Sequence, residues 1–101
     1  MTIEIKKNEK EMTVEVGGRL DTITAPTLEQ TLCDNLAEIE TLILDLDALE
    51  YISSAGLRIL LSTQKKMQYV GAMKLINVCD AVMEVFEMTG FADILTIEKK
   101  A

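Results

Sequence analysis

The amino-acid sequence predicts a single α/β domain in the order β-β-α-β-α-β-α-β, with a mixed sheet whose core is largely parallel and with helices packed on it. Its 101 residues are enough for one domain with a hydrophobic core. Two early segments alternate apolar and polar residues, which is typical of half-buried strands. Strand-like and helix-like segments then follow one another, which favours parallel pairing with right-handed crossovers. We expect the domain to span residues 2–99.

The first two predicted strands form a hairpin. Residues 3–6 alternate between isoleucine and a charged side chain, and residues 12–16 continue this period of two. The polar residues 7–10 between them predict the turn. Gly17-Gly18 is expected to end the second strand.

A helix is expected over residues 26–38. Pro26 suits the first helical position because its φ angle is already helical and its missing N–H would have no partner there. Glu29 adds negative charge near the positive end of the helix dipole. The apolar stripe of this helix consists of Leu28, Leu32, Leu36 and Ile39.

Residues 41–46 predict the central strand, and their apolar density indicates burial on both faces. A helix over 54–69 follows, and Gly71 is expected to end it. Its inner face carries Leu57, Leu60, Leu61 and Met67. The scattered methionines are expected to fill the core or its edge; they are Met12, Met67, Met73, Met83 and Met88.

The remaining elements are a strand over 74–78, a helix over 81–88 and a last strand. Asp80 is expected to cap the helix, and Gly90 to stop it. The helix buries Val82, Val85 and Phe86, and the last strand contains Ile94, Leu95 and Ile97.

Charge and composition exclude several kinds of function. Ten Lys and Arg against seventeen Asp and Glu give a formal net charge of −7, which disfavours nucleic-acid binding because phosphates are neutralised by basic residues. The chain has no His, which removes Ser–His and Cys–His nucleophile pairs, His-ligated zinc and imidazole acid–base chemistry. We expect a protein that is not an enzyme and that uses no cofactor and no metal.

The cysteines and the N-terminal residues indicate a cytoplasmic protein. Cys33 and Cys79 match no C-x-x-C spacing and are expected to be buried, reduced thiols. The first residues are too charged for a signal peptide, and no apolar run approaches a membrane span.

Parallel pairing would gather three segments at one end of the sheet. They are residues 18–22, 51–54 and 79–80, which follow the second, third and fourth predicted strands. Binding sites collect at that end of open α/β sheets.

Residues 51–57 carry the most informative motif, Tyr-Ile-Ser-Ser-Ala-Gly-Leu. Ser53 or Ser54 suits the N-cap of the helix, which is a purely structural role. The alternative is a hydroxyl displayed on a helix N-terminus, where a phosphate would be tolerated but a docked partner would be repelled. Gly56 leaves room for the close approach of another surface.

The same residues resemble the STAS domain (sulphate transporter and anti-sigma factor antagonist) family. The resemblance rests on 42–46 followed by 51–58, and it extends along the chain through Gly18-Arg19-Leu20-Asp21, Ala25-Pro26 and 86–90. It implies a STAS-like fold and a bacterial anti-sigma factor antagonist. In that family the unphosphorylated domain binds an anti-sigma factor that is also a serine kinase, and a PP2C-type phosphatase reverses the phosphorylation.

The resemblance also implies the site residues. The family's phosphoacceptor lies two residues before the motif glycine, which is Ser54 here. Sporulation members have Asp-Ser-Ser-Gly where this chain has Ser53-Ser54-Ala55-Gly56, so Ser53 is a secondary candidate acceptor. We expect a free monomer, without membrane insertion, whose partner-binding residues are Asp21, Thr22, Ser53, Ser54, Gly56, Leu57, Arg58 and Asp80.

Other functions and roles stay open at this point. Some STAS proteins are accessory subunits of membrane transport systems, including lipid transporters, and have no phospho-switch. A nucleophilic Ser54 would need a Lys or carboxylate base, and nucleotide binding would need a site other than the absent P-loop motif.

Several charged residues have two interpretations each. Asp21 either pairs with a basic group on a partner or is a solvated turn residue. Asp45 and Asp47 are either structural residues at a strand end or two of the oxygen ligands of a metal. Arg58 and Lys65-Lys66 either lie on a solvated helix face or attract an acidic partner.

Overall fold

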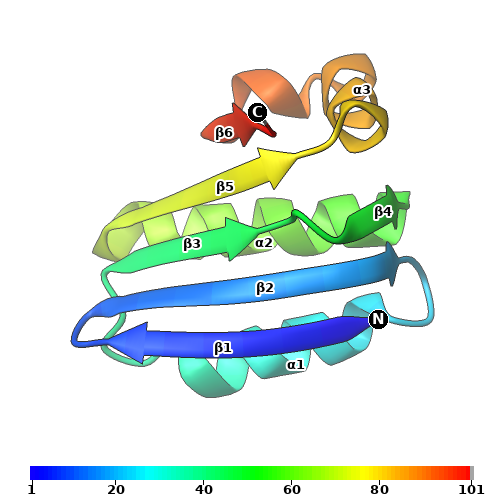
Figure 1. The fold of residues 1–101 in the computed structure, drawn as a ribbon. Coiled ribbons are helices and arrows are strands. Elements are labelled where there is room, and N and C mark those ends of the chain that lie inside the picture. Colours follow the sequence, from blue (N-terminus) through cyan, green and yellow to red (C-terminus); the bar gives the residue numbers. More distant parts are fainter. Residues whose placement is uncertain (101) are drawn as a thin grey trace.

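The computed structural model describes residues 1–100, and its strands form one mixed six-stranded sheet (Figure 1). The strand order is β1-β2-β3-β5-β6, with β4 paired to β2. In chain order the elements are β1 (Thr2–Asn8), β2 (Glu11–Leu20), α1 (Ala25–Asn35), β3 (Thr41–Asp45), β4 (Leu49–Ile52), α2 (Ser54–Val70), β5 (Ala72–Val78), α3 (Asp80–Thr89), the 3₁₀ helix η1 (Phe91–Asp93) and β6 (Ile97–Lys99). The predicted order is confirmed, with β4 and η1 as additions.

The predicted hairpin and parallel core are both present. β1 pairs antiparallel with β2, while β2 with β3, β3 with β5 and β5 with β6 are parallel. The register places Ile5, Val14, Leu44 and Leu75 side by side across four strands. The last three are fully buried, because α1 and α2 lie against this face of the sheet (Figure 1).

The opposite face of the sheet lacks such a cover, so the prediction that β3 is buried on both faces is wrong. Leu42 and Leu44 are buried, but Ile43 between them is only partly buried. The apolar run of β3 therefore reflects one buried face and one half-exposed face. A run of this length cannot distinguish the two cases, because period-two burial is hidden when both alternate positions are aliphatic.

The glycine pair does not end β2, which continues to Leu20. Gly18 has a φ of 87°, and the register shifts between Gly18 and Arg19 where β2 changes its pairing to β4. A left-handed residue at a bulge is readily supplied by glycine. The irregularity at Gly18 therefore lies where the last residues of β2 pair with β4.

β4 is the strand that the sequence analysis missed. It pairs in parallel with the end of β2 and leads directly into α2. Leu49 and Ile52 are buried while Glu50 and Tyr51 are exposed, so the strand shows no period-two pattern. Its effect is to deliver the start of α2 to the carboxyl end of β2.

Three smaller expectations are also wrong. Cys33 is exposed on α1 because it lies outside the apolar stripe of that helix, whereas Cys79 is half-buried. Met88 is exposed at the end of α3. The last strand contains Ile97 but not Ile94 or Leu95, which follow η1.

Helix ends are closer to expectation. α1 ends at Asn35, before the predicted residue 38, and α2 runs from Ser54 to Val70 with Gly71 at its C-cap. Gly90 ends α3 with a left-handed φ of 81°, as expected for a C-terminal glycine. Asp80 is the first residue of α3, but Cys79 occupies its N-cap, so the predicted capping role of Asp80 is wrong.

Candidate functional site

The start of α2 lies against the end of β2. The backbone N–H of Ser53 donates to the carbonyl oxygen of Leu20 at 2.9 Å, so the predicted neighbourhood of residues 18–22 and 51–54 is confirmed. The second segment reaches this place through β4 and not directly from β3. Cys79 is close to the other end of β4, where its thiol lies 3.6 Å from the carbonyl oxygen of Leu49.

The two serines of the motif have different environments. Ser53 is the N-cap of α2, and its carbonyl oxygen accepts the Leu57 N–H at 2.9 Å. Its side chain makes no capping hydrogen bond, and its buried Oγ has no partner within residues 1–100. Ser54 is exposed as the first residue of the helix. Only the second hydroxyl is therefore open to an enzyme or a partner.

The first turn of α2 favours an anion at its surface. It contains no acidic residue, and the first N–H groups of any helix lack intrahelical acceptors. Together with the helix dipole they give the N-terminus a partial positive charge. A negative group on Ser54 would therefore be attracted by the partial positive charge of the helix end, and no carboxylate in the same turn would repel it.

Gly56 is buried, so its closest neighbours belong to the protein itself. A Cβ atom at this position would lie 2.7 Å from Cγ of Leu20 and 2.9 Å from Cγ1 of Ile52. Leu57 is also buried. The surface that Gly56 allows to approach is thus that of β2 and β4 within the domain itself, and neither Gly56 nor Leu57 lies on an exposed surface.

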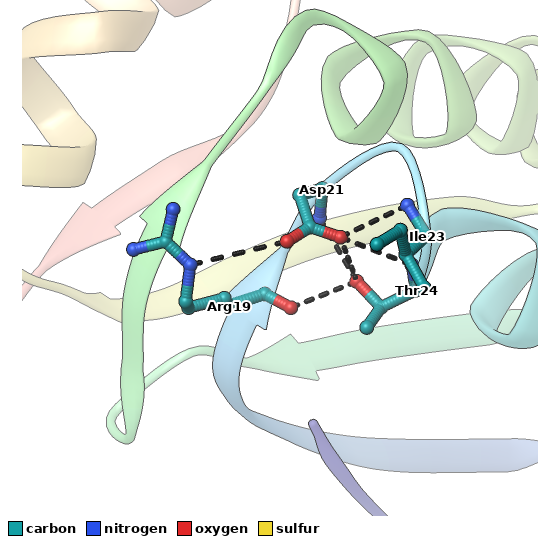
Figure 2. Close-up of polar contacts among 4 residues, drawn as sticks. All are labelled: Arg19, Asp21, Ile23 and Thr24. Carbon is teal, nitrogen blue, oxygen red and sulfur yellow. Dashed lines mark hydrogen bonds and ion pairs between the residues drawn. The ribbon is translucent and has the colours of Figure 1, made fainter.

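Asp21 organises the loop between β2 and α1 (Figure 2). Its Oδ1 accepts the backbone N–H groups of Ile23 and Thr24 at 3.0 and 3.1 Å. Thr24 Oγ1 donates to the carbonyl oxygen of Arg19 at 2.8 Å and accepts the Asp21 N–H at 2.9 Å. Arg19 Nε lies 3.9 Å from Asp21 Oδ2. Asp21 is thus neither a loose turn residue nor a carboxylate fully available to a partner.

These bonds affect the acidity of Asp21. The hydrogen bond from the Thr24 backbone N–H is the largest cause that holds the pKa of Asp21 below its ordinary value of 3.8, with desolvation opposing it and the Ile23 N–H assisting it. Because the charged form is the one that accepts these bonds, protonation weakens them.

We expect the loop to keep its order down to mildly acidic pH. A lowered folded-state pKa means that the stabilisation is complete above the unfolded value of 3.8 and is lost as the pH falls through the still lower folded value. The amide resonances of Ile23 and Thr24 should therefore be constant between about pH 7 and pH 5 and move only below the ordinary Asp value. The Asp21→Asn variant, which keeps an acceptor but does not titrate, should remove this acid transition. A transition well above pH 3.8 in the wild-type protein would contradict the assignment.

A shallow groove runs between the start of α1, with the loop before it, and α2. Its volume is about 450 Å³, and its lining includes Thr22 from the loop and Ala55 and Arg58 from α2. Arg58 is exposed in this groove. Arg19, which precedes the loop in the sequence, places its guanidinium group 4.1 Å from the centre of the Tyr51 ring. The structure thus brings Thr22 and Arg58 together among the predicted partner-binding residues, and Ser54 directly precedes the lining residue Ala55.

The remaining candidates lie elsewhere. Asp80 is exposed and pairs with Lys99 at 3.5 Å, and no hydrogen bond within residues 1–100 links it to Ser54. Asp45 accepts from the Asp47 N–H and from Asn77 Nδ2, both at 3.1 Å. Lys65 and Lys66 are exposed on α2, with Lys66 Nζ 3.7 Å from Cys33 Sγ. The described residues contain no group of three or more potential metal ligands.

A family model described as the STAS domain matches residues 2–101. This chain belongs to the STAS domain family. The anti-sigma-B factor antagonist of Bacillus subtilis (strain 168) is 28% identical over 102 residues, which cover 100% of this chain and 94% of that protein.

Solved STAS-like structures have the same fold. An anti-sigma factor antagonist from Mycobacterium paratuberculosis has a TM-score of 0.87 and 28% identity, covering 96% of this chain and 84% of that one. SpoIIAA in its unphosphorylated form has a TM-score of 0.82 and, in its phosphorylated form, 0.75, each with 16% identity and 95% of this chain covered. These matches cover 87% and 90% of the SpoIIAA chains.

Within residues 1–100 no helix combines the length and the apolar character that a membrane span requires.

Proposed function

We propose that this STAS domain is an anti-sigma factor antagonist, a regulatory binding protein whose partner is an anti-sigma factor. The relatives that carry this description match nearly the full length of the chain. The observation that supports it best is the exposed Ser54 at the N-terminus of α2, beside the ordered loop of Asp21. A surface built in this way suits the docking of another protein.

The finer part of the proposal is a phosphorylation switch. The unphosphorylated domain binds an anti-sigma factor that is also a serine kinase, and phosphorylation of Ser54 releases the complex. A phosphate adds about −1.5 to −2 charges to a hydroxyl. The positive end of α2 tolerates this charge, so the free domain stays folded, whereas a partner docked over Ser54 would bury it unpaired. A PP2C-type phosphatase restores the binding form.

Ser54 is the proposed acceptor, in preference to Ser53. The Oγ of Ser53 is buried, so it is closed to a kinase in this conformation. The side chain of Ser54 is exposed on the same turn. This chain has Ser53 where sporulation members have Asp, but the Ser53 hydroxyl is not a second accessible acceptor.

The test is a phosphorylation assay with the anti-sigma factor kinase from the same cells and ATP, read by intact mass and site mapping. The wild-type domain should gain one phosphate on Ser54. The Ser54→Ala variant should gain none but should still bind the anti-sigma factor, and Ser53→Ala, the matched control, should be phosphorylated like the wild type. A phosphate on Ser53, or co-purification with a transporter ATPase in place of a sigma-factor regulator, would contradict the proposal.

A further inference from the structure

Ile23 is the most exposed aliphatic side chain in the described part of the chain. It is 85% exposed at the tip of the loop between β2 and α1. Scattered exposed aliphatic residues are common on proteins and need no explanation by themselves. Ile23 differs from them in how its backbone is held and in what lies next to it.

The loop holds Ile23 from both sides. The Ile23 N–H donates to Asp21 Oδ1, and the next residue contributes its backbone N–H to the same oxygen and its hydroxyl to the carbonyl of Arg19 (Figure 2). These bonds hold the backbone of Ile23 in place, although its apolar side chain is not buried within the protein. Order of this kind reduces the entropy lost when the residue is buried by a partner.

Ile23 also adjoins the Ser54 surface. Its neighbour Thr22 lines the same groove as Ala55, the residue after Ser54, and Arg58. The Ser53–Leu20 backbone hydrogen bond fixes the two segments to each other. A partner that covers Ser54 therefore meets the loop as part of one continuous surface.

We infer that Ile23 is an apolar anchor of the surface that binds the anti-sigma factor, and that it enters an apolar pocket on that protein. This inference rests on the proposed function. Within it, Asp21 is a positioning residue: its carboxylate presents Ile23 and does not itself form the main contact with the partner. A few well-buried residues of an interface commonly dominate its affinity, while their neighbours mainly exclude water.

The test compares two exposed apolar residues by calorimetric titration of the unphosphorylated domain with purified anti-sigma factor. Ile23→Ser should weaken binding by about thirtyfold or more, and Ile23→Val should largely retain it. Tyr69, which is 90% exposed near the other end of α2, provides the matched control, and Tyr69→Ser should leave the affinity unchanged. Both positions are solvated, so the melting temperatures of the variants should match that of the wild type.

The positioning role of Asp21 is tested separately. Asp21→Ala should weaken binding of the domain with Ile23 present and have little further effect in the Ile23→Ser background, because both changes remove the same contact. Equal affinities of the wild type and Ile23→Ser would overturn the inference while leaving the proposed function intact. If Ile23→Ser weakens binding but Ser54→Glu does not, the anchor stands and the phospho-switch fails. Absence of any binding by the wild type would contradict both.

Discussion

A Ser54→Glu substitution is expected to abolish or severely weaken binding of the anti-sigma factor while the domain remains folded. Ser54 is exposed at the first position of α2, and a carboxylate there lies at the favourable end of the helix dipole. The same carboxylate would be buried without a partner in the complex, which costs about 2–5 kcal/mol. The expected loss of affinity is therefore about thirtyfold to several-thousandfold.

The measurement is the dissociation constant of the complex with purified anti-sigma factor, together with the melting temperature of the free domain. Ser54→Ala serves as the control, since it removes the hydroxyl without adding charge and should bind like the wild type. Tight binding by Ser54→Glu would show that Ser54 lies outside the interface or that the partner accommodates a negative charge. Either outcome rejects charge repulsion as the release mechanism.

The second large effect is expected from Gly71→Ala, which should strongly destabilise the fold. Gly71 joins α2 to β5, and a methyl group on it would overlap the carbonyl oxygen of Glu40. That oxygen accepts the Ala72 N–H at 2.9 Å, so it cannot move away without breaking the first bond between these segments. Forcing an extra methyl group into a fixed site costs about 3 kcal/mol. For a domain of this size the melting temperature should fall by about 15 °C.

Gly90→Ala is the matched control for this prediction, because the causes differ at the two glycines. No atom lies within 4 Å of a Cβ at Gly90, but its φ of 81° is left-handed. Its substitution should cost only about 1 kcal/mol, from backbone strain. Chemical unfolding of the two variants in parallel separates the steric effect from the conformational one. If the Gly71→Ala protein were as stable as the Gly90→Ala protein, the predicted steric clash with Glu40 would be wrong.

Local sequence patterns predicted most of the fold, because the side chains that define them also pack the core. The alternation around Val14 and the helical spacing of Leu28 and Leu32 correspond directly to buried positions. β4 was not predictable in this way, since its pairing depends on the bend that Gly18 introduces into a strand thirty residues earlier. Non-local pairing of this kind leaves no period in the short strand itself.

The sequence indicated where the candidate site lies in the fold, but not the environment of each of its side chains. The paired serines marked the start of α2, and the phospho-switch hypothesis required an exposed Ser54, which the structure has; the burial of the Ser53 hydroxyl was not indicated by the motif. Gly56 suggested space for a partner, whereas Leu20 and Ile52 occupy that space. Asp21 was recognised as a candidate contact, and its bonds to the loop became evident only from the tertiary structure.

The hydrogen bond between Ser53 and Leu20 affects how fast the domain can switch between its binding and non-binding forms. The Ser53 N–H is bonded to Leu20 and the Ser53 carbonyl oxygen to the Leu57 N–H, so a group added to Ser54 joins a segment that is already hydrogen-bonded on both sides. Under the proposed switch no slow refolding step follows each chemical event. The fraction of the domain that can bind the anti-sigma factor would then follow the current activities of the kinase and the phosphatase.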